Sequence, residues 1–155
     1  MKYKFIYKNN TLDFWRLSIY YTYGSIVGVC NIIFTVAMIL LSLKVWTEAS
    51  SIIRILLVIA CCLFPIIQPI GIYNRAKRQA AAAKEIELSI GETGIHINMG
   101  NESSNLEWNT IKKISKKLDM IVIFSTATHG FILTNKVLGK QKDEFYNYLI
   151  SKVNR

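Results

Sequence analysis

The residues of this chain whose types and spacing could do chemistry are mainly basic. Two groups of four stand out: Lys112, Lys113, Lys116 and Lys117, and then Arg75, Lys77, Arg78 and Lys84. Ammonium and guanidinium groups close to a bilayer attract anionic headgroups, and each contributes about 1 kcal/mol. We therefore expect these residues to bind a membrane surface. The alternative for both groups is a solvated basic face, which runs of charge commonly form.

Catalytic and metal-binding patterns are missing from the sequence. His96 and His129 have no carboxylate or cysteine at ligand spacing, and the acidic residues are scattered. No phosphate-binding loop, nucleophile elbow or HExxH motif occurs, although a triad assembled in space would escape such a search. We expect a protein that is not an enzyme and that has no metal or cofactor. Without a reading helix or aromatic-interleaved strands, nucleic acid is not an expected partner.

Six residues in or beside two apolar stretches could pack or hydrogen-bond within a membrane: Gly24, Gly28, Asn31, Pro65, Gln68 and Pro69. The two amides are costly in lipid, so we expect them to face protein, either within a hairpin or in a partner. The two prolines each remove a helical hydrogen bond and predict a bend. The two glycines have GxxxG spacing, for which we favour packing within the hairpin over a homo-oligomer.

The two apolar stretches, at about 25–43 and 52–72, organise the chain. A hydrocarbon core of roughly 30 Å needs about 20 apolar residues in a helix, and each stretch is near that length. Of the net charge of +9, the connector with Arg54 contributes +1 and the flanks contribute +8. Because basic flanks stay in the cytoplasm, we predict a multi-pass protein of the inner (cytoplasmic) membrane with both termini cytoplasmic. A signal peptide is disfavoured, since a second apolar stretch follows at once.

The chain therefore divides into four predicted segments. Residues 1–24 hold a strand at Lys2–Lys8 and an interfacial helix capped by Asn10 or Thr11. Residues 25–72 form a transmembrane helical hairpin, residues 73–85 a basic helical extension, and residues 86–155 a cytoplasmic domain.

Alternating apolar residues predict several strands in the cytoplasmic domain, at Ile86–Ile90, Ile95–Met99, Met120–Thr126 and Phe131–Thr134. An amphipathic helix is predicted at about Gln141–Val153. Residues 100–105 have the composition of a polar loop. The segment Leu106–Leu118 is open between helical spacing and a strand with one helical turn.

Five short segments follow the apolar stretches in a recognisable order: Glu87, Gly94–Ile95, Trp108–Ile111, Asp119–Ile123 and Phe131–Lys136. Together with the N-terminal strand, the hairpin and the final helix, this layout resembles the YcxB-like family over essentially the whole chain. The resemblance implies a cytoplasmic domain similar to bacterial pleckstrin-homology-like domains. The implied fold class is membrane α+β, with a two-span helical hairpin and a small bent antiparallel β-sheet closed by a C-terminal helix. The chain departs from the family pattern at Thr134, in place of a proline, and at Leu138, in place of an aromatic residue.

Three functions remain open at this point. The leading hypothesis is a non-catalytic, membrane-anchored interaction module whose cytoplasmic domain binds a protein partner or the anionic inner leaflet. The second is a membrane immunity protein that neutralises a toxin, which rests on analogy with small basic two-span proteins. The third is a membrane enzyme, which would need a buried polar cluster where Asn31 and Gln68 meet the prolines.

Overall fold

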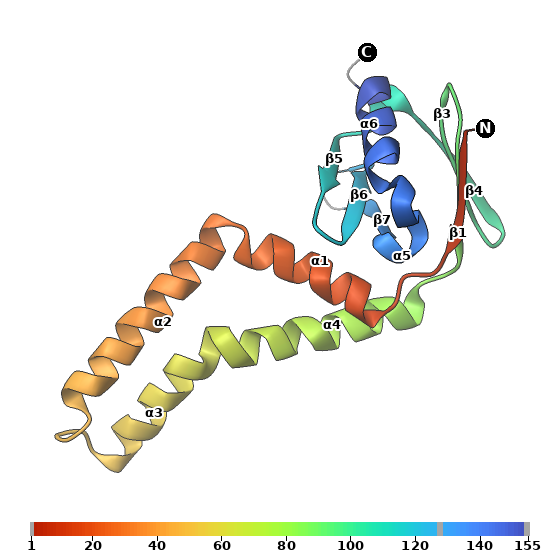
Figure 1. The fold of residues 1–155 in the computed structure, drawn as a ribbon. Helices are drawn as coiled ribbons and strands as arrows, with labels where there is room; N and C mark the ends of the chain where they lie inside the picture. The colour runs from red at the N-terminus through yellow and green to blue at the C-terminus, as the bar shows by residue number, and fades with distance from the viewer. Residues whose placement is uncertain (1, 127–128, 154–155) are drawn as a thin grey trace. The chain divides into compact units, whose positions relative to one another are not determined.

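The computed structural model describes residues 2–126 and 129–153. The chain divides into two compact units. A helical hairpin unit comprises Asn10–Ala82, and a β-rich unit combines the segment up to Asn9 with the segment from Ala83 onward. Figure 1 shows the helices of the first unit and the strands of the second.

The hairpin unit contains four α-helices and one π-helical turn: α1 (Thr11–Tyr23), α2 (Ile26–Val45), α3 (Ser51–Cys62), the turn Leu63–Ile67, and α4 (Gln68–Ala82). The predicted cap of the first helix is confirmed. The Asn10 side chain accepts a hydrogen bond from the Asp13 amide at 3.0 Å, and the Asp13 carboxylate accepts one from the Asn10 amide at 2.9 Å. This reciprocal pair satisfies two amides that a helix start leaves without partners.

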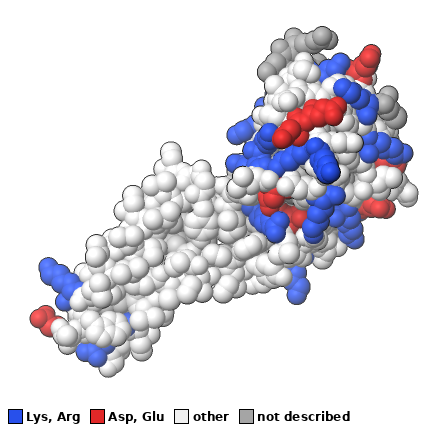
Figure 2. Space-filling view, viewed as in Figure 1, with Lys and Arg blue, Asp and Glu red and all other residues white. Residues whose placement is uncertain are grey.

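Two helical segments are long and apolar enough to cross a membrane. They are Ile26–Val45, of 20 residues, and the continuous helical segment Ser51–Ala82, of 32 residues. Their apolar side chains are largely exposed, with Ile26 at 84% and Ile52 at 73%. On the face shown in Figure 2, the surface over α2 and α3 carries no charge except near their connector. Both predicted spans therefore coincide with helices.

The second of these segments changes hydrogen-bond register in its middle. The Gln68 amide donates to the Leu63 carbonyl, five residues back, which defines the π-helical turn. Pro65 lies within this turn and Pro69 follows it. Figure 1 shows the helix changing direction between α3 and α4, as the prolines predict.

The described residues of the β-rich unit form two antiparallel sheets. One has the order β1-β2-β3-β4 and the other the order β5-β6-β7. The strands are β1 (Tyr3–Tyr7), β2 (Ile86–Ile90), β3 (Gly94–Met99), β4 (Glu102–Glu107), β5 (Lys113–Lys116), β6 (Met120–Phe124) and β7 (Gly130–Thr134). The remaining elements are 3₁₀ turns at Trp108–Thr110 and Gly139–Gln141, and helices α5 (Asn135–Leu138) and α6 (Lys142–Val153).

One apolar core joins both sheets to α6. Leu88, Ile95 and Ile97 come from the first sheet, and Ile121 and Ile123 come from the second. Phe145 and Leu149 complete the core from α6, and both are fully buried. The strand alternation explains this placement, because every second residue of β3 points to the same face.

Two sequence-based expectations for this unit are corrected. The segment expected as a polar loop at 100–105 is wrong, because β4 begins at Glu102 and pairs with β3 from Met99↔Glu102 to Gly94↔Glu107. β4 is an edge strand exposed at nearly every position, so it has no apolar alternation to reveal it. The strands also divide between two sheets, and the break falls at the 3₁₀ turn Trp108–Thr110. This turn followed by β5 settles the ambiguous segment as a strand preceded by one helical turn.

Candidate functional site

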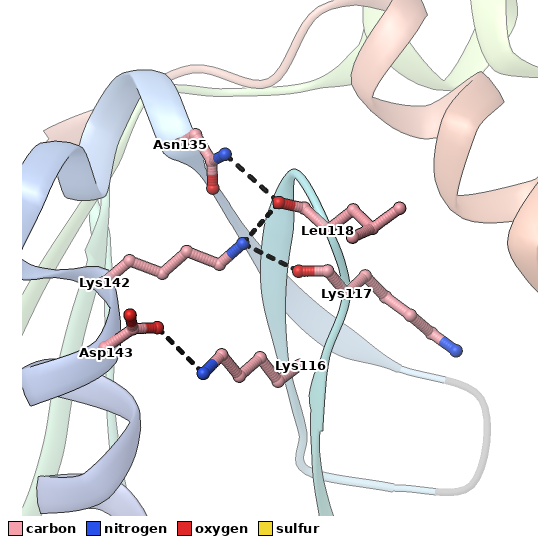
Figure 3. A network of polar contacts seen from close by, with 6 residues as sticks. All are labelled: Lys116, Lys117, Leu118, Asn135, Lys142 and Asp143. Atoms are coloured by element: carbon pink, nitrogen blue, oxygen red, sulfur yellow. Dashed lines mark hydrogen bonds and ion pairs between the residues drawn. The ribbon is translucent and has the colours of Figure 1, made fainter.

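The turn between β5 and β6 is held by side chains from the C-terminal helical segment (Figure 3). Lys142 Nζ donates to the carbonyl oxygens of Lys117 at 2.7 Å and of Leu118 at 2.6 Å. Asn135 Nδ2 donates to the same Leu118 carbonyl at 3.2 Å, and the Asn135 amide donates to the Asp119 carbonyl at 2.8 Å. The half-buried Lys142 ammonium, the Asn135 side chain and the Asn135 backbone amide thus satisfy the three consecutive carbonyls of the turn.

Lys116 is engaged in packing the second sheet against α6. Its Nζ lies 2.8 Å from an Asp143 carboxylate oxygen and 5.1 Å from the centre of the Tyr146 ring. The hydrogen bond and charge of Lys116 lower the pKa of Asp143. This partner makes Lys116 less available to an external anion than an unpaired lysine would be.

The structure does not bring the four lysines of the first group onto one face. Within β5, Ile114 and Lys116 share the face turned toward the core and α6, and Lys113 lies on the opposite face. Lys112 precedes the strand and is exposed. Lys112 and Lys113 are therefore the members of this group that point outward with no partner among the described residues.

The second basic group belongs to both units. Arg75, Lys77 and Arg78 are exposed on α4 of the hairpin unit. Arg75 and Arg78, three positions apart, share a face of that helix. Lys84 belongs to the β-rich unit, where its ammonium lies 3.7 Å from the Glu102 carboxylate.

A polar network connects three helices of the hairpin unit. Asn31 of α2 is buried, and its Nδ2 donates to Gln68 Oε1 of α4 at 3.1 Å. The Tyr23 hydroxyl of α1 donates to the Phe64 carbonyl at 2.5 Å and lies 3.3 Å from the same Gln68 oxygen. Asn31 and Gln68 therefore meet each other within the hairpin.

The Phe64 carbonyl needs an external donor because of the proline that follows. In the π-helical register its partner would be the amide of residue 69, five positions later, and proline has no N–H. The Tyr23 hydroxyl supplies the missing donor. The sequence around Tyr23 carries no sign of this contact, although a proline within a helix always leaves one carbonyl without its amide donor.

The two glycines serve the corner between α1 and α2. A Cβ at Gly28 would lie 2.5 Å from both the Tyr23 Cα and the Tyr23 carbonyl oxygen, so only glycine permits this approach. Gly24 caps α1, and its amide donates to the Tyr20 carbonyl at 3.1 Å. Both glycines therefore shape this corner, and packing of the GxxxG pair within the hairpin stays a prediction.

The histidines lie apart in the β-rich unit. His96 Nδ1 is hydrogen-bonded to Asn105 Oδ1 across β3 and β4, beside a hollow of about 380 Å³. His129 lies at the β6–β7 turn, where its amide donates to the Thr126 hydroxyl at 2.9 Å. Within residues 2–126 and 129–153, no three His, Cys, Asp or Glu side chains converge in a way that could hold a metal ion.

Comparison with known families finds a match over the segment that carries the β5–β6 turn. Residues 90–149 match the family model of the YcxB-like proteins. The resemblance to this family is thereby confirmed over these residues. The YcxB-like region runs from the end of β2 into α6, so it includes Leu118, Asn135 and Lys142 but not β1 or the hairpin unit. Searches of curated proteins and of solved structures found no match.

Proposed function

We propose that this protein is a membrane-anchored, non-catalytic module. The hairpin unit crosses the inner membrane twice, and the β-rich unit lies on the cytoplasmic side, where its basic residues bind anionic lipid. The observation that carries this proposal is the ladder between β1 and β2, in which Tyr3 pairs with Ile90 and Tyr7 with Ile86.

The β1–β2 ladder constrains the topology. The two strands flank the hairpin unit in sequence, and paired strands lie about 5 Å apart. Both ends of the hairpin unit must therefore emerge on the same side of a bilayer, and two spans meet this requirement. The two apolar helices supply these two spans.

The distribution of charge indicates which side that is. The connector and Arg54 carry a net charge of +1, and Arg54 is tied into the connector by a hydrogen bond of 3.0 Å from its Nε to the Trp46 carbonyl. The flanks carry +8, including Arg75 and Arg78 just after the second span. Because basic flanks are retained in the cytoplasm, this balance supports a cytoplasmic β-rich unit.

The fold of the β-rich unit supports the same function. The described residues of this unit form antiparallel strands and a C-terminal helix, the kinds of element that the YcxB-like resemblance implies for a pleckstrin-homology-like domain. We extend the resemblance to that fold as part of the proposal. Exposed Lys112 and Lys113 can reach anionic headgroups, each contributing about 1 kcal/mol.

The test uses the full chain, because the β-rich unit includes β1. A donor dye is attached through Ser103→Cys, at an exposed position of β4, after replacement of Cys30, Cys61 and Cys62. The protein is placed in nanodiscs that contain a headgroup-labelled acceptor lipid, either in phosphatidylcholine alone or with phosphatidylglycerol. We expect energy transfer to rise with phosphatidylglycerol and to fall in high salt, which screens exposed charges.

Lys112→Ser combined with Lys113→Ser should lower the ratio of docked to undocked protein roughly thirtyfold, since two lysines contribute about 2 kcal/mol. Lys44→Ser, which removes a charge at the connector end of α2, is the matched control and should change nothing. Energy transfer that is the same in both lipid compositions refutes lipid binding. A C-terminal reporter reached from outside intact cells refutes the topology.

A further inference from the structure

An apolar side chain projects from the tip of the β5–β6 turn. Leu118 is 87% exposed, more than any other large hydrophobic residue described in this protein. In the β-rich unit, the other strongly exposed large hydrophobic side chain among the described residues is Ile6, at 58%. Single exposed leucines are common on protein surfaces, so exposure alone decides nothing.

The turn that carries Leu118 is held in one conformation. The Lys117 amide donates to the Met120 carbonyl at 2.8 Å, which closes the turn. Lys142 and Asn135 donate to the carbonyls of Lys117 and Leu118 (Figure 3), and the Asn135 backbone amide donates to the Asp119 carbonyl. In this view the Leu118 side chain points away from Lys142 and Asn135. The leucine is thus presented at a fixed position, and little conformational entropy remains to be lost when it is buried.

The surroundings of Leu118 are basic. Residues 116–119 and the segment 135–143 that holds them contain five lysines and two aspartates: Lys116, Lys117, Lys136, Lys140 and Lys142, with Asp119 and Asp143. Lys136 and Lys140 are exposed and adjoin the residues that fix the turn. An exposed apolar tip among lysines matches a bilayer with anionic headgroups, in which the leucine enters the acyl region and the ammonium groups remain at the phosphates.

We propose that Leu118 is a membrane anchor of the β-rich unit, which enters the headgroup–acyl boundary of an anionic bilayer while the exposed Lys136 and Lys140 contact lipid phosphates. Lys142 and Asn135 act as positioning residues that hold the turn. This inference rests on the proposed function, in which the unit lies at an anionic membrane surface. A tip with one apolar side chain fits a lipid surface better than a protein partner, which would need a larger contiguous patch.

The direct test places an environment-sensitive nitrobenzoxadiazole dye at the turn. The chain without Cys30, Cys61 and Cys62 carries Leu118→Cys for labelling, and Ser103→Cys serves as the matched control. In phosphatidylglycerol-containing nanodiscs we expect the emission from position 118 to shift to the blue and to be quenched by lipids with a doxyl group on the acyl chain. The dye at position 103 should show neither effect.

A second experiment keeps the turn unlabelled. With the donor dye at position 103, Leu118→Ser should lower the ratio of docked to undocked protein about tenfold, and Leu118→Ile should restore it. Lys142→Met, which keeps an unbranched side chain one atom shorter and without donors, should weaken the blue shift of the dye at position 118.

The outcomes separate this inference from the proposed function. If energy transfer still rises with phosphatidylglycerol while the dye at position 118 stays in a polar environment, the anchor is refuted and lipid binding by lysines stands. An unchanged response after Leu118→Ser has the same meaning. If the dye at position 118 is quenched equally in neutral and anionic discs, Leu118 inserts and the electrostatic part of the proposed function is wrong. A blue shift that appears only on addition of a soluble protein fraction overturns the lipid anchor.

Discussion

Removing the Tyr23 hydroxyl should destabilise the hairpin unit because of a proline on a different helix. Tyr23→Phe leaves the Phe64 carbonyl without a donor, since Pro69 cannot provide one. A buried polar group without a partner costs about 1–3 kcal/mol in general, whereas hydrogen bonds in membrane proteins average about 0.6 kcal/mol. We therefore expect a loss of about 1 kcal/mol, which is roughly a fivefold change in the unfolding equilibrium.

The double variant Tyr23→Phe with Pro69→Ala separates the missing amide from other causes. Pro69→Ala restores an amide N–H at the position that the π-helical register assigns to the Phe64 carbonyl. In that background Tyr23→Phe should cost little, so the double-mutant cycle should show a coupling energy of about 1 kcal/mol. The free energies are measured by equilibrium unfolding in mixed detergent and dodecyl sulfate micelles, followed by tryptophan fluorescence.

Tyr73→Phe is the matched control for this cycle. Tyr73 lies on α4 with its ring 6.4 Å from Trp15, and its hydroxyl has no hydrogen bond to the described residues. Its substitution should change stability little in either background. If Tyr23→Phe has the same effect with proline and with alanine at position 69, the missing amide is not the reason for the Tyr23 contact.

Three further predictions concern other positions. Gly28→Ala should destabilise the hairpin unit by about 1–3 kcal/mol, because the new methyl group would clash with the Tyr23 backbone. Gly71→Ala is the control: the space around Gly71 is open, so this substitution should be neutral or stabilising in the same unfolding assay. Burial raises the pKa of Tyr7, whose hydroxyl has no hydrogen-bond partner among the described residues, so the protein should lose stability as the pH rises above about 10. Tyr7→Phe should reduce this alkaline loss of stability in pH-dependent unfolding, and the smaller part that remains includes Tyr3, whose pKa burial also raises. Lys116→Gln should raise the pKa of Asp143 toward its ordinary value near 4, as measured by carbon-13 NMR of the carboxyl group. In the unsubstituted protein, the contribution of Asp143 to stability is present above about pH 4 and disappears as the pH falls through the lowered pKa.

Elements with strong local signals were predictable from the sequence. The cap at Asn10, the two apolar helices and the strand β6 each follow from a few adjacent residues, and the structure confirms them. β4 was not predictable, because an exposed edge strand is defined by its partner β3 and not by its own polar sequence.

The candidate sites depend on contacts between residues far apart in the chain. Lys142 lies 24 positions from Leu118, and Tyr23 lies 41 positions from Phe64. The basic composition around residues 112–117 was visible in the sequence, but strand alternation divides those lysines between opposite faces. The meeting of Asn31 with Gln68 was an expectation from the cost of amides in lipid, and the hairpin provides it.

The pairing of β1 with β2 also sets an order of events during synthesis. β1 leaves the ribosome first, but its partner is made about 80 residues later, which takes roughly 4 to 16 s at ordinary elongation rates. During this interval both apolar helices are synthesised while Tyr3 and Tyr7 remain without their partner strand. β1 therefore pairs only after the whole hairpin unit has been made, and a completed β1–β2 ladder reports that both apolar helices have already left the ribosome.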